Sequence, residues 1–262
     1  MPGSLKGSAL ITGTAILGIC RGAAIAFAQA GCQRFLLGDV NEAGLHSTRE
    51  VIIKQAPSAD LDIAYLDVTD EVSVDDFGAR CVARFGRLDY VCNIAGICPP
   101  RTPVTDVDVA TYDKVVAVNL YGTFLCHPAE IRQMLKQPLS EDKCRGCIVS
   151  TSSMAGLNAS PGASPYASTK FGIIGLVKTD SMDYGAHGIR VNAFCPGYTD
   201  TPALEAISTA DQRAALGASI PLQRVGQPVD VGRVFAFLCS EEASYMHGTA
   251  YLVVGGAMAY RK

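Results

Sequence analysis

The sequence predicts an α/β fold in which helices cover both faces of a doubly wound parallel sheet. Short apolar segments alternate with longer helical ones along the chain. Most of the apolar segments lack polar alternation, which is typical of strands buried on both faces. The first strand leads through a glycine-rich turn into a helix. The 262 residues suffice for one core and contain no linker, so we expect a single domain, 1–262.

Each expected element follows from its local pattern. Short, mainly apolar runs predict strands at 9–11, 35–37, 61–66, 88–92, 147–150, 189–194 and 249–254. Ala-rich or amphipathic segments between them predict helices at 18–30, 42–55, 72–85, 112–136, 165–187 and 229–240. Because crossovers between parallel strands are right-handed, few topologies remain.

Two segments fit neither pattern. Residues 138–146 are polar and predict a surface loop. Residues 198–228 are long and bounded by prolines, and they follow a strand at the edge of the sheet where such folds bind ligands. We therefore expect the loop at about 198–228 to cover a substrate.

Composition excludes several classes of protein. Charged residues make up 18%, hydrophobic residues 48%, and the net charge is −3, so the chain is not disordered. No apolar run is long enough to span a membrane, and the N-terminus lacks the pattern of a signal peptide. Lys and Arg do not cluster beyond pairs, so we expect neither a nucleic-acid nor a lipid surface.

The ten cysteines do not predict a disulfide framework, because the chain is long and their spacing is irregular. Most lie in apolar runs, where cysteine packs as a small core residue. We therefore expect a reducing compartment, the cytoplasm. The C-x-x-C pair, Cys144 and Cys147, has no second ligand pair, and the four histidines are scattered, so we expect no metal site.

The first strand and helix predict a dinucleotide site. Gly13 and Gly18 follow the strand, and a helix N-terminus after such a turn offers backbone N–H groups to a pyrophosphate. Asp39 ends the second strand, 21 residues beyond Gly18, where an acidic side chain accepts hydrogen bonds from the adenosine ribose. Asp39 can also cap the next helix. Asp67, after the third strand, is either an adenine contact or a turn residue.

Ser153, Tyr166 and Lys170 form the strongest candidate cluster. The last two are four residues apart, so they lie on one face of a helix, with Ser164 as the expected N-cap and Pro165 in the first turn. A cation beside a phenol favours the phenolate, so we expect Lys170 to lower the pKa of Tyr166 for proton transfer near neutral pH. Ser153 ends a strand and can hydrogen-bond the same substrate oxygen.

These motifs resemble those of the short-chain dehydrogenases/reductases in their compact single-domain form. The resemblance covers nearly the whole chain, and the residues that carry it are Asn93-Ile94-Ala95-Gly96, Asn119, Ser153, Tyr166, Lys170, Pro196-Gly197, Thr201 and Gly255-Gly256. It implies a Rossmann-type sheet of about seven parallel strands, a nicotinamide cofactor, and a homodimer or homotetramer.

The resemblance also implies a catalytic tetrad. Tyr166 is the expected general acid/base, and Lys170 lowers its pKa and holds the ribose. Ser153 orients the substrate, and Asn119 fixes a water in a proton relay. The expected cofactor-binding residues are Gly13, Leu17, Gly18, Ile19, Asp39, Asp67, Val68, Asn93, Ala95, Gly96, Tyr166, Lys170, Pro196, Gly197, Thr199 and Thr201. Around the substrate we expect the apolar residues Ile97, Met154, Leu157, Leu204, Ile207 and Leu216.

Three features depart from the family pattern. Four residues instead of three separate the first two glycines, and Cys20 replaces the third glycine. Ile94 replaces the second asparagine of a paired turn. Pro128 lies inside the helix after Asn119, where it should kink the chain. The first two departures bear on cofactor affinity, and the third bears on Asn119 or the subunit interface.

We expect an NAD(H)-dependent oxidoreductase that interconverts a secondary alcohol and a ketone on a hydrophobic small molecule. NAD is expected over NADP because Asp39 would repel a 2′-phosphate and no Lys or Arg directly follows the second strand. Arg21, the nearest cation, should point along the first helix. One alternative is a non-redox isomerase, dehydratase or cyclase that uses the tetrad for acid–base catalysis. Another is a dinucleotide sensor without catalysis.

Overall fold

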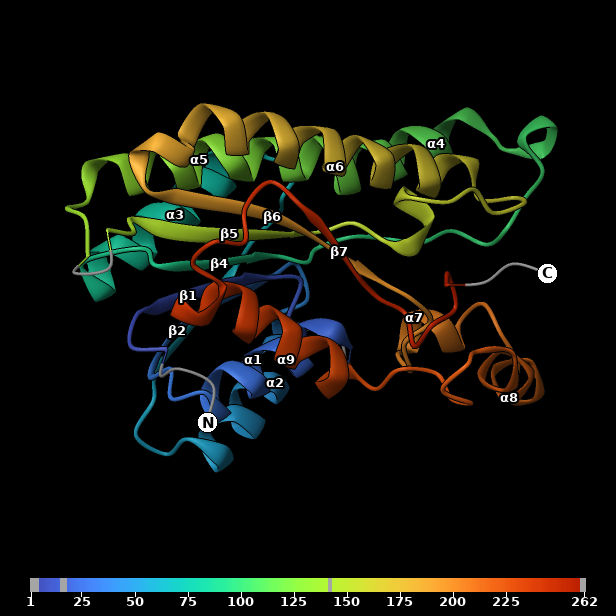
Figure 1. Ribbon diagram of the computed structural model, residues 1–262, viewed down its shortest axis with the longest axis horizontal. Helices are drawn as coiled ribbons and strands as arrows, with labels where there is room; N and C mark the ends of the chain where they lie inside the picture. The colour runs from blue at the N-terminus through green and yellow to red at the C-terminus, as the bar shows by residue number, and fades with distance from the viewer. Residues whose placement is uncertain (1–4, 15–17, 141–142, 260–262) are drawn as a thin grey trace.

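Seven parallel strands form one sheet in the computed structural model, which describes residues 5–14, 18–140 and 143–259. The strands lie in the order β3-β2-β1-β4-β5-β6-β7 (Figure 1). Their bounds are β1 Ser8–Thr12, β2 Arg34–Asp39, β3 Asp60–Tyr65, β4 Tyr90–Asn93, β5 Gly146–Thr151, β6 Ile189–Pro196 and β7 Ala250–Val253. The predicted Rossmann-type parallel sheet is confirmed.

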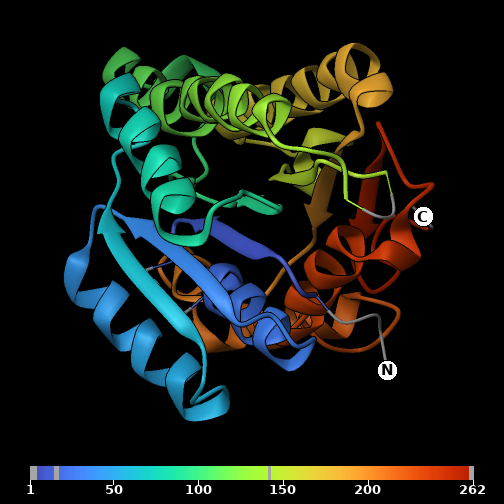
Figure 2. The ribbon, with the colours of Figure 1, turned by 90° about the vertical axis from the view of Figure 1, so that its left-hand side faces the viewer.

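Helices cover both faces of this sheet (Figures 1 and 2). One face carries α1 Ile19–Gln29, α2 Glu42–Gln55 and α9 Pro228–Cys239. The other carries α3 Glu71–Phe85, α4 Val109–Val115, α5 Gly122–Lys136 and α6 Ser164–Tyr184. Two short helices, α7 Pro202–Glu205 and α8 Ala210–Ser219, lie beyond the carboxyl end of β6.

Successive residues of the strands enter two separate cores. In β1, Ala9 and Ile11 pack in the core that contains Phe27 of α1, whereas Leu10 packs in the core that contains Ile173 of α6. Because neighbouring side chains of a strand point to opposite faces, a strand without polar residues needs a layer of helices on each side. This packing explains the apolar runs of the sequence.

The order in which successive strands are added to the sheet reverses at β1. Strands β2 and β3 lie on one side of β1, and β4 to β7 lie on the other. In such sheets ligands bind in the crevice outside the carboxyl ends of the strands, where the order reverses. No helix among the described residues is long and apolar enough to cross a membrane.

The helix predicted at 112–136 begins three residues earlier, at Val109, and is irregular in its middle. Asp108 caps α4, because its side chain accepts a hydrogen bond from the Thr111 N–H at 2.7 Å. α4 continues through a π-helical segment, Val116–Tyr121, into α5. α5 runs through Pro128 without a break, so the irregular turns lie around Asn119 and not at the proline.

The segment 198–228 is organised by the two short helices. α8 begins with a capping box, in which the Thr209 and Gln212 side chains each accept a hydrogen bond from the other residue's backbone N–H, at 3.2 and 2.8 Å. This spacing is a known start signal of helices. Leu204 of α7 is 7% exposed and thus anchors the segment over the carboxyl end of the sheet.

Candidate active site

Tyr166 and Lys170 lie one turn apart on α6. The helix begins at Ser164, so its N-cap is Ala163 and the prediction of Ser164 as the N-cap was wrong. Lys170 Nζ lies 5.4 Å from the centre of the Tyr166 ring. It donates a hydrogen bond of 2.8 Å to the carbonyl of Thr151, at the end of β5. The predicted pair therefore stands at the carboxyl edge of the sheet.

Burial dominates the acidity of both groups. Lys170 is 3% exposed, and desolvation lowers its pKa to about 8. Desolvation also raises the pKa of Tyr166 above its ordinary value, and the Ser153 hydroxyl opposes that rise. The cost of removing water from the phenolate is the largest of these effects, and the lowering of the Tyr166 pKa by Lys170 stays a prediction.

Ser153 follows β5 and lies beside Tyr166. Its Oγ accepts the Ala155 N–H at 3.1 Å, which starts the short helix Met154–Gly156. Ser153 lines the same cavity as Tyr166. Two hydroxyls can therefore contact one oxygen of a bound molecule.

Asn119 is held by the loop that follows β4. Its Oδ1 accepts the Ile97 N–H at 2.8 Å, and its Nδ2 donates to the Ile97 carbonyl at 2.9 Å. A Cβ on Gly96 would lie 3.2 Å from Asn119 Oδ1 and 3.6 Å from Lys170 Nζ. The π-helical segment, this loop and α6 therefore meet at Gly96, and all four predicted catalytic residues lie in one region.

The turn after β1 allows a very close approach of two backbones. Gly13 has a φ of +75°, and a Cβ there would lie 2.7 Å from Ala95 Cα, so glycine is required. The Gly13 N–H donates to the Gly38 carbonyl at 2.8 Å. Thr12 Oγ1 accepts the N–H groups of Ile94 and Ala95 at 3.0 and 3.1 Å. The Thr12 hydroxyl thus holds the turn in which the second asparagine is missing.

The N-terminus of α1 has no side-chain cap. Gly18 is the N-cap residue, and no side-chain hydrogen bond satisfies the first N–H groups within the described residues. Such groups at the start of an eleven-residue helix attract an anion. Cys20, which replaces the third glycine, is 8% exposed and packs in the core, so its side chain is accommodated. Leu17, also predicted here, lies outside the described residues.

Asp39 ends β2, as predicted, beside this turn. Its negative charge acts on the Cys20 thiol, and its Oδ1 accepts the Asn41 N–H at 3.0 Å. Asn41 and not Asp39 caps α2, since the Asn41 side chain accepts the Gly44 N–H at 3.1 Å. The alternative reading of Asp39 as the helix cap was therefore wrong.

Arg21 and Asp67 take part in local hydrogen bonds. Arg21 donates to the Ser47 and Thr48 hydroxyls at 3.0 and 3.2 Å, so it is held against α2 and does not point along α1. Asp67 Oδ1 accepts the N–H and the hydroxyl of Thr69 at 2.9 and 2.7 Å. Asp67 is thus a turn residue, and its adenine contact stays a prediction.

Two further predicted cofactor residues point into the protein. Asn93 is 5% exposed, and its Nδ2 donates to Glu130 at 3.0 Å. Val68 packs so closely on Gly122 of α5 that a Cβ on the glycine would lie 2.7 Å from it. Cofactor contacts of Asn93 and Val68 would therefore come from their backbone atoms.

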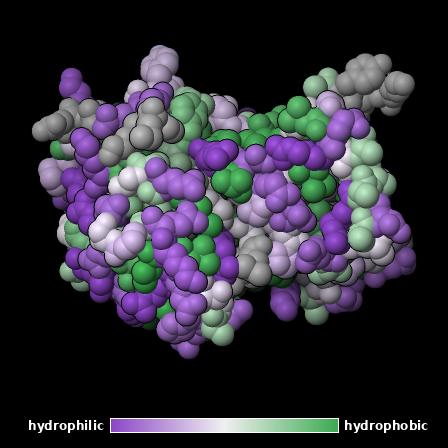
Figure 3. Space-filling model, turned by 90° about the horizontal axis from the view of Figure 1, so that it is seen from below, coloured by the Kyte–Doolittle hydropathy of each residue, from purple (hydrophilic) through white to green (hydrophobic). Residues whose placement is uncertain are grey.

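A cavity of about 200 Å³ opens beside Tyr166. From below, the surface is indented between the part that holds α1, α2 and α9 and the part that holds α7 and α8 (Figure 3). Reasoning from the sequence missed Cys98, Arg101 and Tyr198, which also line the cavity. Three expected substrate contacts, Ile97, Leu157 and Leu216, are not on its wall. The predicted residues that are on it are Ile19, Ser153, Met154, Tyr166, Pro196, Gly197, Thr199, Thr201, Leu204 and Ile207.

A larger cavity, about 790 Å³, lies at the opposite edge of the sheet, and its lining includes Arg145 and Arg190. Arg145 Nε donates to the Gln137 carbonyl at 3.0 Å. Arg190 donates to the carbonyls of Ser240 and Met246 at 3.2 and 3.3 Å. These guanidinium groups therefore satisfy carbonyls at the ends of helices and in turns.

Comparisons with known proteins agree with this geometry. Residues 13–258 match the family model described as enoyl-(acyl carrier protein) reductase. The chain is 34% identical over 257 residues to levodione reductase of Leifsonia aquatica, covering 95% of this chain and 93% of the relative. It is 34% identical over 249 residues to the 3-oxoacyl-acyl-carrier-protein reductase of Thermotoga maritima, covering 94% and 96%.

A further relative and a solved structure extend the likeness. The cis-4-hydroxycyclohexanecarboxylate dehydrogenase of Sinomonas cyclohexanicum is 38% identical over 193 residues, covering 74% of this chain and 75% of the relative. The crystal structure of levodione reductase has a TM-score of 0.89 at 32% identity, covering 97% of this chain and 98% of that one. With the parallel sheet and the Tyr166–Lys170 pair, these likenesses show that the chain belongs to the short-chain dehydrogenase/reductase family of NAD(P)-dependent oxidoreductases that act on small molecules.

Proposed function

We propose that the protein is an NAD(H)-dependent oxidoreductase that interconverts a secondary alcohol and a ketone on a mainly apolar small molecule. The observation that carries this proposal is the cavity beside Tyr166, whose largely apolar wall also holds the Ser153 hydroxyl. A ketone oxygen placed between the two hydroxyls would accept hydrogen bonds from both. The apolar wall would hold the rest of the substrate.

The four predicted catalytic residues would share the work of proton transfer. Tyr166 gives its phenolic proton to the carbonyl oxygen during reduction and takes a proton from the alcohol during oxidation. The Lys170 ammonium, 5.4 Å from the ring centre, stabilises the negative charge that then develops on the phenol. Asn119 keeps the loop after β4 in place through Ile97 and, as the family resemblance implies, would fix a water of the proton relay.

The residues around β1 and α1 fit a dinucleotide. The uncapped N-terminus of α1 and the close turn at Gly13 would hold the pyrophosphate. Asp39 would accept hydrogen bonds from the adenosine ribose. Thr199 and Thr201, after β6, would lie along the nicotinamide, which accepts or donates the hydride when bound.

Asp39 makes NAD the expected cofactor. Its carboxylate would meet a 2′-phosphate as one anion against another. Val40, which follows it, is 56% exposed and offers no cation, and the Arg21 side chain is held by the hydroxyls of α2. We expect kcat/KM with NADH to exceed that with NADPH at least tenfold, which requires only about 1.4 kcal/mol.

Steady-state kinetics with both cofactors on one ketone test this preference. Asp39→Ala combined with Val40→Arg should reduce or reverse it, because the double variant removes the anion and adds a cation. Val40→Ala is the matched control and should keep it. Equal or better use of NADPH by the wild-type enzyme would refute the role of Asp39.

The names of two relatives support the substrate class. One is a dehydrogenase of cis-4-hydroxycyclohexanecarboxylate, which is a secondary alcohol on a ring. Another is a reductase of levodione. A small ring would suit a cavity of about 200 Å³ with apolar walls.

A homodimer or homotetramer is also part of the proposal. Three aromatic side chains are about half exposed: Tyr121 of the π-helical segment at 47%, Phe124 of α5 at 50% and Phe171 of α6 at 49%. The Tyr121 and Phe124 rings stack at 6.2 Å. Exposed apolar side chains that gather on one side favour an interface. Light scattering tests this directly, and a monomer at micromolar concentration would refute it.

The cytoplasm is the proposed location. All ten cysteines carry free thiols, and eight of them are buried. Free thiols in this number are typical of a reducing compartment. Fractionation of the source cells would test the location.

A further inference from the structure

Arg101 is the charged side chain on the wall of the cavity beside Tyr166. Every other described residue that lines this cavity is neutral. Arg101 lies in the loop after β4 and is exposed, whereas Ser153 lines the cavity from the segment after β5 and Tyr166 lines it from α6. The cavity is thus apolar over most of its wall, with two hydroxyls at the reacting end and a cation at its opening.

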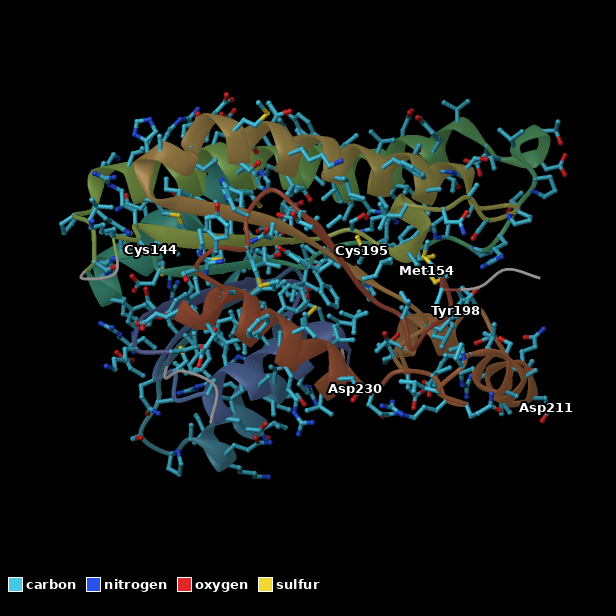
Figure 4. The ribbon with its side chains drawn as sticks, in the orientation of Figure 1. Cys144, Met154, Cys195, Tyr198, Asp211 and Asp230 are labelled. Atoms are coloured by element: carbon cyan, nitrogen blue, oxygen red, sulfur yellow. The ribbon has the colours of Figure 1, made fainter. Side chains whose placement is uncertain are left out.

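Contacts on two sides hold Arg101 in this place. The Thr102 N–H donates to the Gly162 carbonyl at 2.9 Å, and a Cβ on Gly162 would lie 3.2 Å from Arg101 Cβ. The backbone of the arginine is therefore tied to the loop before α6. Its Nη2 donates to the Tyr198 hydroxyl at 3.2 Å. Figure 4 shows Tyr198 close to Met154, another residue of the cavity wall.

The guanidinium of Arg101 has no carboxylate partner among the described residues, unlike those arginines that form ion pairs. Arg80 pairs with Asp62 at 2.7 Å, and Arg224 pairs with Asp230 at 2.6 Å. None of the ion pairs among the described residues includes Arg101. A guanidinium offers five N–H donors in a planar fork that matches a carboxylate, and one neutral phenol leaves most of them available.

The charge of Arg101 also reaches toward the catalytic residues. Desolvation raises the pKa of the Cys98 thiol, and the positive charges of Lys170 and Arg101 both oppose that rise. The two cations therefore act on the same part of the cavity wall, where they would attract an anion.

We propose that Arg101 binds a carboxylate of the substrate, at the end remote from the reacting carbon. The substrate class is then a small apolar ketone or secondary alcohol that carries one carboxylate. This inference rests on the proposed function, because it takes the cavity beside Tyr166 as the substrate site. A carboxylate fits better than a phosphate, since the described wall of a cavity of about 200 Å³ offers a single cation.

Kinetics with a matched pair of ketones test the inference. The pair is 4-oxocyclohexanecarboxylate and its methyl ester, which differ in charge and little in shape. We expect the wild-type enzyme to favour the acid at least tenfold in kcat/KM, as the loss of a charge-assisted hydrogen bond predicts. Arg101→Gln should lower kcat/KM at least tenfold for the acid and less than threefold for the ester. Equal losses for both would mean that Arg101 only supports the loop, and would overturn the inference.

Two further variants separate charge from structure. Arg101→Lys keeps the charge but not the planar fork, so it should retain part of the preference for the acid. Tyr198→Phe removes the phenol that contacts Arg101, and it should leave the ratio of acid to ester unchanged. A collapse of this ratio in Tyr198→Phe together with an unchanged ratio in Arg101→Gln would assign the preference to Tyr198 and contradict the inference.

A binding measurement distinguishes this inference from the proposed function. Cyclohexanecarboxylate carries no hydroxyl or ketone, so it can bind but cannot react. Calorimetric titration into the enzyme with NAD⁺ should show at least tenfold weaker binding to Arg101→Gln. If this difference is found but neither ketone is reduced, the proposed function fails and the carboxylate site stands. If both ketones are reduced and binding is equal or absent in both proteins, the inference fails alone.

Discussion

Two largely buried polar clusters connect the strands to α5 and α6, and they differ in whether a cavity reaches them. The active-site cluster consists of Asn119, Ser153, Tyr166 and Lys170, and two of its members line a cavity. The closed cluster consists of Asn93, His127, Glu130, Ser150 and Asp180, and none of its members lines a cavity described above.

Internal hydrogen bonds link most groups of the closed cluster, although the buried Asn93 Oδ1 has no partner among the described residues. His127 Nδ1 lies 2.5 Å from Asp180 Oδ2, and His127 Nε2 lies 2.7 Å from Ser150 Oγ. Asn93 Nδ2 donates to Glu130 Oε2 at 3.0 Å. Burial raises the pKa of Glu130 to about 7, and the neighbouring His127 opposes the rise. Both ring nitrogens of His127 therefore have hydrogen-bond partners.

The comparison shows why chemistry-bearing residues alone do not identify a site. Ser150, His127 and Asp180 are linked in the order found in hydrolase triads, and Glu130 has a strongly shifted pKa. Ser150 is nevertheless 0% exposed, so no substrate can reach its hydroxyl. Ionisable groups with shifted pKa values mark a candidate site only where a cavity reaches them. Of the cavities described above, one reaches the active-site cluster and none reaches the closed cluster.

The largest expected effect belongs to Tyr166→Phe. This change deletes the hydroxyl proposed to transfer the proton, so kcat should fall by about 10²–10⁴-fold. NADH affinity, measured by fluorescence titration, should change less than threefold because the ring remains. A variant that keeps more than about a tenth of the wild-type rate would contradict the acid/base role.

The next effect concerns stability and belongs to Glu130→Gln. In the folded protein the pKa of Glu130 is about 7, against an ordinary value of 4.5. Above pH 7 the folded protein therefore holds a buried charge, whereas at pH 4.5 and below the group is neutral in both states. The contribution of Glu130 to the free energy of unfolding is therefore fully present below pH 4.5, and it is lost as the pH rises through 7.

Urea unfolding at several pH values measures this difference. Glu130→Gln removes the charge but keeps an oxygen that can accept from Asn93, so it should stabilise the protein at pH 8 by up to about 3 kcal/mol. At pH 5 the gain should be much smaller. A gain that does not depend on pH would show that the charge of Glu130 is not the cause.

The sequence predicts the sheet well because its strands carry the signal themselves. The wholly apolar run around Leu10 reflects two cores, one on each face, whereas the edge strands β3 and β7 are partly exposed. The π-helical turns around Asn119 could not be predicted, since no residue pattern announces them. The capping box of Thr209 and Gln212 was visible at the correct spacing, but the prolines on either side led to the expectation of a loop.

The candidate active site, too, could be predicted only in part from the sequence. Spacing within one helix brings Tyr166 and Lys170 together, and the structure shows that pair at the expected edge of the sheet. The contact of Arg101 with Tyr198 joins residues 97 positions apart, so no local pattern could reveal it. The raised pKa of Tyr166 was missed because burial depends on the packing of distant loops and not on the neighbouring lysine.

The smallest expected effect comes from Ser150→Ala and tests the comparison most directly. The change removes the Oγ that lies 2.7 Å from His127 Nε2, leaving a buried nitrogen without that partner, so unfolding should cost about 1–2 kcal/mol less. The kcat should stay within twofold of the wild type, because no substrate reaches the closed cluster. Ser153→Ala, three residues along the chain, is the matched control. It also loses one hydrogen bond, that from the Ala155 N–H, so its stability should fall by a similar amount, about 1 kcal/mol, whereas its kcat should fall at least tenfold. If Ser150→Ala lost most of its turnover while remaining folded, the closed cluster would be part of the catalytic machinery, and access would no longer separate the two clusters.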